Sequence, residues 1–261
     1  MEIRQVTSNF MEYKFIYKEK QICNYLYLLL DGQDALIIDT GYKEDMKRLL
    51  EFLNEKEIEI KRVVLSHYHN DHFEGLKLLK DVEIIGSKQY THAIDQYYLK
   101  DSINDEKYFP DLFIEEVESI KHGNFELKFI NSPGHSKCSI STIINDEYIH
   151  VADNIMHSHQ GIPHLPLPYY SFSSHIKSLQ QLKNNSSYKI ISSHSNEDQC
   201  KNIIENGEVD ARIKYMETVM TSKRELTFEE LISDLASNNF HIQFHSKWYK
   251  HVYDLFHELK K

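Results

Sequence analysis

A dense group of metal-binding residue types follows directly on three apolar residues in the first third of the chain. The segment Ser66–His72 reads SHYHNDH, so three imidazoles and one carboxylate stand within six positions. Alternate side chains of a strand share a face, so a strand that runs into this segment can aim His67 and His69 the same way. The turn that follows then brings Asp71 and His72 to a second point nearby. The pattern therefore predicts a strand that ends directly before this loop and positions its side chains.

The chemistry of the segment favours a metal site. Borderline-soft divalent metals such as zinc bind imidazole nitrogen together with carboxylate oxygen. The alternative is a polar loop with incidental histidines, since the chain contains 16 of them. Against that alternative, a suitable ligand fills every position of the pattern, and the flanks have the character of a strand before and a helix after.

Most of the chain up to residue 193 alternates between β-like and helical patterns. Helical spacing of apolar residues predicts helices at 43–53, 74–80, 88–99 and 173–182. Residues 100–113 and the proline-rich 154–171 are predicted to be loops, the first near the mouth of the site. Strands are predicted at residues 2–17 (as short edge strands), 22–30, 35–39, 60–65, 82–85, 125–130, 139–144, 148–152 and 188–193. This alternation indicates a layered α/β fold.

Four more candidate residues stand at the ends of predicted strands: Asp39, His135, Asp153 and His194. A sheet can project such residues into one shared cleft. Each also has an ordinary alternative, because Asp39 could cap the next helix, Asp153 could belong to a turn, and His194 could lie in a surface loop. Their common position after apolar runs, together with the histidine segment, favours a joint role.

These motifs resemble those of the metallo-β-lactamase superfamily. His-x-His-x-Asp-His is similar to its signature, and the other four motifs occur in the family's order: Ile-Asp-Thr-Gly, Pro-Gly-His-Ser, Val-Ala-Asp-Asn and Ser-Ser-His-Ser. The fourth motif reads Ala-Asp where relatives usually have Gly-Asp. The resemblance covers about three quarters of the chain. It implies a four-layer αββα sandwich.

After about residue 196 the β-like patterns stop. Helical patterns cover 197–220, 227–237 and 245–260, and Thr227 followed by Glu230 predicts a capping box at the start of the second of these helices. We therefore expect a metallo-β-lactamase-like core at residues 1–196 and a helical extension packed on it at 197–261.

The resemblance also implies the roles of the site residues. His67, His69 and His135 would bind one metal, and Asp71, His72 and His194 a second, with Asp153 bridging the two. Asp39 would orient a ligand without binding metal, as ligating histidines need a hydrogen-bonded partner. The expected cofactors are two divalent metal ions, zinc first, with iron or manganese as alternatives.

The implied reaction is hydrolysis. Two metals that share a hydroxide lower its pKa and let it attack a carbonyl, here of a small ester, thioester or lactone. Asp71 would orient that nucleophile or move a proton. His69 stands where flavodiiron relatives carry Glu, and the Asp153 carboxylate is generally absent from true β-lactamases. Both point to the branches that resemble glyoxalase II and lactonases, although the glutathione-binding stretch of glyoxalase II is absent after Asp153.

Three alternatives stay open from the sequence. The helical tail is similar to that of a branch in which some members cleave RNA, so a nuclease or phosphodiesterase is the first rival. A net charge of −10 makes nucleic acid an unfavourable partner and a small-molecule substrate the preferred one. The others are a mononuclear iron oxygenase on the same fold and a non-enzymatic metal- or ligand-binding protein.

Four residues are candidates for the substrate pocket. His157 and His159 belong to the loop after Asp153, which should border the metals. Tyr68 and Tyr169 can both pack against a substrate and donate to an oxyanion.

Composition bounds the setting. Cys23, Cys138 and Cys200 are far apart and odd in number, so no disulfide framework is expected. No apolar run approaches a membrane span, and the first residues lack the pattern of a secretory signal. We expect a cytoplasmic protein without membrane contact. A homodimer is left open.

Overall fold

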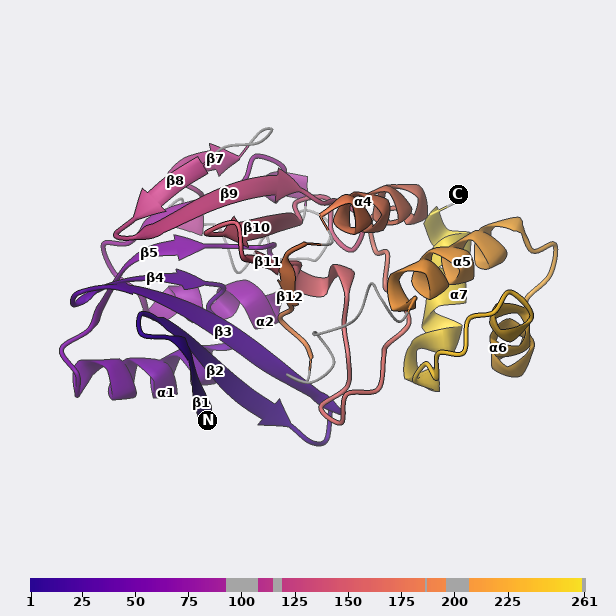
Figure 1. Ribbon diagram of the computed structural model, residues 1–261, viewed down its shortest axis with the longest axis horizontal. Coiled ribbons are helices and arrows are strands. Elements are labelled where there is room, and N and C mark those ends of the chain that lie inside the picture. Colours follow the sequence, from indigo (N-terminus) through magenta and orange to yellow (C-terminus); the bar gives the residue numbers. More distant parts are fainter. Residues whose placement is uncertain (93–107, 115–118, 186, 196–206, 260–261) are drawn as a thin grey trace.

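Two β-sheets lie face to face in the computed structural model of this chain (Figure 1). It describes residues 1–92, 108–114, 119–185, 187–195 and 207–259. Within those ranges the first sheet has seven strands in sequence order, and the second has five in the order β12-β11-β10-β9-β8.

The first sheet changes from antiparallel to parallel at β4. Strands β1 to β4 pair antiparallel, and β4 to β7 pair parallel. Parallel neighbours need a crossover, and α1 (Lys43–Asn54) provides the one between β4 and β5. As a result the carboxyl ends of β4 and β5 meet at the same edge. The strands are β1 (Glu2–Thr7), β2 (Phe10–Tyr17), β3 (Ile22–Asp31), β4 (Asp34–Ile38), β5 (Glu59–Val64), β6 (Glu83–Ser87) and β7 (Leu112–Ile114).

The second sheet is antiparallel except for its β11–β12 pair. Helix α4 (Phe172–Asn184) makes the crossover between these two parallel strands. The turn between β10 and β11 carries Asn145 and Asp146 at positive φ, which Asn and Asp tolerate better than most residues. The strands are β8 (Ser119–His122), β9 (Phe125–Asn131), β10 (Ile140–Ile144), β11 (Tyr148–His150) and β12 (Lys189–Ile191).

Alternation along the strands builds the layers. In β4, Leu36 and Ile38 belong to the apolar cluster between the two sheets, whereas Ala35 and Ile37 belong to the cluster under α1. A third cluster lies on the outer side of the second sheet and includes Leu179 of α4. The order helix, sheet, sheet, helix confirms the predicted αββα sandwich.

The C-terminal helices gather at one end of the molecule, beside α4 (Figure 1). They are α5 (Glu208–Thr221), α6 (Phe228–Ser237), the 3₁₀ helix η5 (Ser246–Trp248) and α7 (Tyr249–Leu259). Val209, Met216 and Phe256 join the same apolar cluster as Leu179, so the extension shares its core with α4. The capping box of α6 is confirmed by reciprocal bonds between Thr227 and Glu230. A boundary at 196/197 stays a prediction.

Three local predictions need correction. The helix predicted at 74–80 is a short α2 (Asn70–Phe73) that begins inside the histidine segment, followed by the 3₁₀ helix η1 (Glu74–Leu78). The loop predicted at 100–113 ends in strand β7, which pairs with β6, and β8 was not predicted. Residues 90–92 are helical, while most of the helix predicted at 88–99, the first part of the 100–113 loop and the start of the helix predicted at 197–220 lie outside the described residues. Where the C-terminal chain is described again, α5 begins at Glu208.

Among the residues described, none of the helices combines the length and hydropathy that crossing a bilayer requires.

Candidate metal centre

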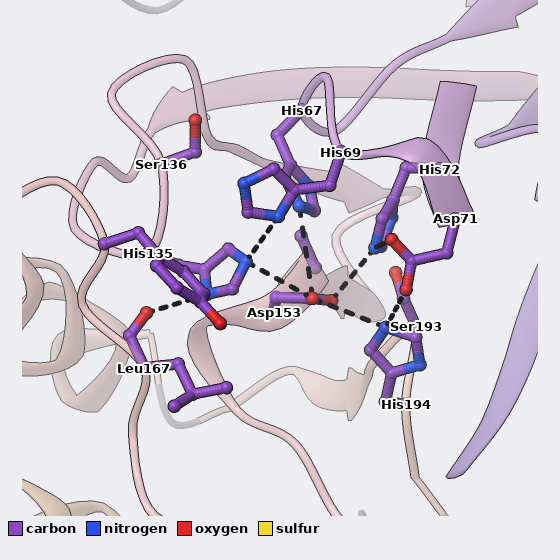
Figure 2. Close-up of polar contacts among 12 residues, drawn as sticks. His67, His69, Asp71, His72, His135, Ser136, Asp153, Leu167, Ser193 and His194 are labelled. Carbon is purple, nitrogen blue, oxygen red and sulfur yellow. Dashed lines mark hydrogen bonds and ion pairs between the residues drawn. The ribbon is translucent and has the colours of Figure 1, made fainter. Parts of the chain in front are cut away.

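All seven predicted metal ligands meet at one edge of the two facing sheets (Figure 2). They come from segments that follow strands of the two sheets. Asp153 lies in the 3₁₀ turn η4 (Ala152–Asn154) after β11, and His194 follows β12. His135 lies in the connection between β9 and β10, and the other four occupy the segment between β5 and η1, at positions 67, 69, 71 and 72.

The carboxylate of Asp153 lies at the centre of this group. Its oxygens are 3.3 Å from Nε2 of His72, 3.3 Å from Nε2 of His194, 3.4 Å from Nε2 of His135 and 4.0 Å from Nε2 of His67. A tetrahedron with metal–ligand bonds of about 2.0–2.1 Å has edges of about 3.3–3.4 Å. The three separations of 3.3–3.4 Å therefore match donors arranged around a metal ion, whereas the 4.0 Å to His67 is longer than such an edge.

The donors form two groups within which the ligand atoms lie less than 4.8 Å apart. One group is His67, His69, His135 and Asp153, and the other is Asp71, His72 and His194. This division agrees with the one that the sequence predicts, with Asp153 close to both. Their role as ligands stays a prediction.

Hydrogen bonds determine which imidazole nitrogen faces the centre. Nδ1 of His135 lies 2.8 Å from the carbonyl oxygen of Leu167, and Nδ1 of His194 lies 2.8 Å from that of Cys23. A carbonyl oxygen can only accept, so each Nδ1 carries the proton and donates it. Nε2 of a neutral ring is then left with its lone pair toward the centre, as metal ligation requires.

Asp39 orients His72 in the same way. Its Oδ2 lies 2.8 Å from Nδ1 of His72, and its two oxygens accept hydrogen bonds from the backbone N–H and hydroxyl of Ser66. Asp39 directly follows β4, has a φ of 59° and is buried, and its carboxylate bonds to the first residue of the histidine segment, Ser66. The placement agrees with the predicted orienting role.

Burial and charge divide the histidines into two kinds. Burial lowers the pKa of His67 and His135 well below the ordinary value, which keeps these rings neutral and available as ligands. Burial also opposes charge on His72, but the carboxylates of Asp153, Asp39 and Asp71 raise its pKa to about 10. These carboxylates create a negative potential at the centre. A bound metal cation would supply the positive charge that this potential favours.

Two backbone features let the ligand loops approach their neighbours. A Cβ added at Gly134 would lie 2.3 Å from Cα of His175 in α4, so only glycine allows this packing next to His135. Ala152 has a φ of 48°, a left-handed conformation that glycine adopts without strain. This explains physically why Gly-Asp is usual at that position, where this chain has Ala-Asp.

A cavity of about 480 Å³ opens onto the candidate ligands. Of the four predicted pocket residues, Tyr68 and Tyr169 line it. The ring of Tyr169 packs 5.3 Å from that of His135, and its hydroxyl lies 3.1 Å from Nε2 of His251. Whether these tyrosines contact a substrate stays a prediction.

His157 and His159 are not among the residues that line this cavity, which corrects their predicted position. His157 is fully buried, with Nε2 2.8 Å from the carboxylate of Glu208 at the start of α5. His159 packs at the surface instead, where its backbone N–H donates to the carbonyl oxygen of Gln21. The physical reason is that the loop after Asp153 packs His157 against α5 and then turns His159 toward the connection between β2 and β3.

Eight lining residues were not predicted, and four of them carry a charge or an aromatic ring: Lys20, Tyr42, Lys247 and Trp248. No motif surrounds them in the sequence. Lys20 belongs to the turn between β2 and β3, and Lys247 belongs to η5, near the other end of the chain. Only the packing of η5 against the turn between β2 and β3 brings these two lysines together at the cavity.

The sequence model described as the Metallo-beta-lactamase superfamily matches residues 22–194. This range includes every candidate ligand and omits the C-terminal helices. It also omits Lys20, Lys247 and Trp248.

Curated relatives match at about one quarter identity. Hydroxyacylglutathione hydrolase of Haemophilus ducreyi is 25% identical over 134 residues, which is 50% of this chain and 49% of the relative. An atrochrysone carboxyl ACP thioesterase of Pseudocercospora fijiensis is 28% identical over 128 residues, 48% of this chain and 35% of the relative. The matched stretch of this chain thus spans at most about half the length of these relatives.

Solved structures agree in fold. A metallo-β-lactamase from Pontibacter korlensis superposes with a TM-score of 0.60 at 16% identity, covering 78% of this chain and 97% of the other. ETHE1 from Myxococcus xanthus has a TM-score of 0.56 at 18% identity, with 88% and 98% covered. At these identities the likeness is one of fold.

Proposed function

Because the chain belongs to the metallo-β-lactamase superfamily, we propose that it is a dinuclear metal-dependent hydrolase of a small ester, thioester or lactone. The observation that carries the proposal is the position of Asp153, whose carboxylate lies 3.3–3.4 Å from histidines of both donor groups. Zinc suits the donor set of five imidazoles and two carboxylates. Two such ions, when bound, would lower the pKa of a shared water and polarise the oxygen of the substrate.

Asp71 is the residue that we propose orients the attacking water and accepts its proton. Its side chain is one-fifth exposed and lines the cavity, and one oxygen lies 3.4 Å from Nε2 of His194. Burial opposes its ionisation, but His72 and His194 hold the pKa of its carboxyl well below the ordinary value. It therefore stays an acceptor at neutral pH and can orient a water molecule entering from the cavity.

Tyr169 is placed to assist at the substrate oxygen. Burial, followed by the charges of Asp153 and Asp71, raises the pKa of its phenol to about 12. The hydroxyl thus keeps its proton at neutral pH and can donate to an oxygen on which negative charge develops.

The names of the relatives support a thioester in particular. One is a thioesterase by name, and the other is named for hydroxyacylglutathione. The absence of a glutathione-binding stretch after Asp153 leaves the thiol part open. Action in the cytoplasm and a homodimeric state stay predictions.

Elemental analysis of protein purified without added metal, combined with assays on a thioester, a lactone, a phosphodiester and a β-lactam, tests the proposal. We expect about two zinc ions per chain and hydrolysis of the carbonyl substrates. One iron per chain without hydrolysis would assign the protein to the oxygenase alternative, and phosphodiester cleavage alone to the nuclease alternative.

The variants Asp71→Ala and His135→Ala distinguish a role in proton transfer from a role in metal binding. His135→Ala should lower the metal content. Asp71→Ala should abolish hydrolysis, and the metal content of that variant tells whether activity is lost with the second metal or through the proton role. Turnover by Asp71→Ala at the wild-type rate would contradict the proposed role of this carboxylate.

A further inference from the structure

Two lysines from opposite ends of the chain line the same cavity as the candidate metal ligands. Lys20 stands in the turn after β2, and Lys247 stands in η5. They are held together directly, because the ammonium of Lys247 donates to the backbone carbonyl oxygen of Lys20. The fold therefore brings two positive charges to one wall of the cavity.

Neither lysine has a carboxylate partner among the residues that the structure describes. Other lysines of this acidic chain do: Lys128 lies 2.7 Å from Asp146, and Lys250 lies 3.3 Å from Asp254. An ammonium has three N–H donors. The observed contacts use one on each residue, since Lys20 donates to the hydroxyl of Tyr42 at 3.0 Å and Lys247 to a carbonyl. Each ammonium keeps donors for a ligand.

Aromatic rings hold both ammonium groups in place. Nζ of Lys20 lies 4.3 Å from the ring centroid of Tyr42, and Nζ of Lys247 lies 4.6 Å from that of Trp248. Both rings also line the cavity. Burial, and then the charge of Lys20, lowers the pKa of Lys247. Two cations that repel each other across a cavity wall are stabilised when an anion binds between them.

We propose that Lys20 and Lys247 form an anion subsite, and that the substrate carries a carboxylate or phosphate group away from the bond that is hydrolysed. The anion subsite rests on the contacts described above, and the anionic substrate rests in addition on the proposed function. Both lysines lie outside residues 22–194, so the superfamily likeness assigns them no role. Ile22, Met156 and Leu167 line the same cavity and would contact the apolar part of the substrate.

Binding can be measured without turnover. Trp248 is the only tryptophan in the sequence, and it lines the cavity beside Lys247, so its fluorescence reports directly on this wall. The full-length, metal-loaded protein is titrated with succinate, with inorganic phosphate and with neutral succinamide. We expect saturable changes with the anions and none with succinamide, and the tighter anion tells a carboxylate from a phosphate substrate.

The Lys20→Met/Lys247→Met double variant tests whether the lysines bind the anion. Methionine keeps most of the apolar stem, so packing on the rings is retained. We expect at least about tenfold weaker anion binding, as for the loss of hydrogen bonds to charged groups. Lys250→Met is the matched control, since this exposed lysine of the same C-terminal segment does not line the cavity. Thermal unfolding checks that both variants are folded.

Unchanged anion affinity in a folded double variant would overturn the subsite, and would show that the anion binds the metals instead. Equal binding of succinate and succinamide would overturn it as well.

Turnover of a matched pair of substrates then connects the subsite to the reaction. S-succinyl- and S-butyryl-N-acetylcysteamine differ in one carboxylate. We expect the wild type to prefer the succinyl compound by at least about tenfold in kcat/KM and the double variant to lose that preference. Hydrolysis of both at equal rates would refute an anionic substrate while leaving the hydrolase intact. Hydrolysis of neither would count against these thioesters as substrates, and the fluorescence titration would still decide on the subsite.

Discussion

Asp39 shows how one carboxylate prepares a metal ligand. It accepts from Nδ1 of His72 and from Ser66, so it fixes the ring that faces Asp153 and at the same time anchors the loop that carries the ring. It contributes to the raised pKa of His72, after Asp153. Orienting partners of this kind typically change metal affinity by about 10–100-fold.

Asp39→Asn should therefore weaken the second metal site selectively. The amide keeps the shape and can still accept a hydrogen bond through oxygen, but it lacks the charge that favours the donating Nδ1–H. We expect about 10–100-fold weaker binding of one of two metals in a chelator competition, with the other unchanged. Asp146→Asn, which affects only an exposed pair with Lys128, is the control. Equal loss of both metals would show that Asp39 acts chiefly by anchoring the loop at Ser66 and would contradict a selective effect through His72.

The start of α5 is joined to the loop after Asp153 by a buried charged cluster. Glu208 lies 2.8 Å from Nε2 of His157 and also pairs with Arg212, whose other nitrogen donates to the carbonyl oxygen of Met156 at 3.0 Å. All three side chains are at most 1% exposed. Burying these charges is costly unless all are paired, so the cluster specifies where α5 docks.

Glu208→Gln should destabilise the protein, and by more at neutral pH than in acid. Burial opposes the charge on Glu208, but Arg212 and then His157 lower its pKa to about 2 from an ordinary 4.5. Because the pKa is lower in the folded state, the ionised Glu208 stabilises the fold at pH values above the unfolded pKa. This stabilisation is lost as the pH falls from about 4.5 through 2. The loss at pH 7 should be about 3 kcal/mol at most, measured by denaturant unfolding at several pH values.

Glu230→Gln is the matched control for this prediction. The pKa of Glu230 is also lowered to about 2, by Arg224 and by the backbone N–H of Thr227, but this ion pair lies at the surface. Solvent screens such pairs, so the loss of stability should be much smaller. Equal losses in the two variants would contradict the importance of burial.

At the scale of the whole molecule, the candidate centre connects the two sheets. Its donors follow strands of both, and the carboxylate of Asp153 approaches histidines from each. A ligand that binds only the folded state stabilises it by an amount set by its concentration relative to Kd. Metal binding here should therefore stabilise the entire sandwich.

Removing metal with a chelator should lower Tm by about 5–10 °C, and added zinc should restore it. This estimate takes about 2.7 kcal/mol for a ligand at 100 times its Kd and about 2–4 °C per kcal/mol for a chain of this size. Differential scanning calorimetry measures it. An Asp153→Ala variant, which lacks the shared carboxylate, should respond little to the chelator. A Tm of the wild type that ignores both chelator and zinc would contradict metal binding at this centre.

Much of this arrangement could be predicted because it is local in the sequence. Alternating apolar residues specify a strand over a few positions. A candidate ligand that directly follows such a strand lies at the edge of the sheet where the strand ends. Such patterns predict a layered α/β fold and the convergence of Asp39, His135, Asp153 and His194, and the resemblance of the motifs to those of the superfamily adds the αββα order of the layers. The short strands β7 and β8 were missed because three or four residues carry little periodicity, and their pairing depends on β6 and β9.

Long-range packing decided the rest. His157 was expected in the pocket, but Glu208, fifty-one positions along the chain, pairs with it in a buried cluster that only the docking of α5 creates. Lys20 and Lys247 share a cavity because η5 packs on the turn between β2 and β3, and the two lysines are 227 positions apart in the chain. The sequence by itself determined the candidate ligands, since they stand in local motifs at the ends of predicted strands and these motifs resemble those of the superfamily. Only the tertiary structure decided what surrounds them, because the free energy of those contacts arises from elements that are distant in the chain.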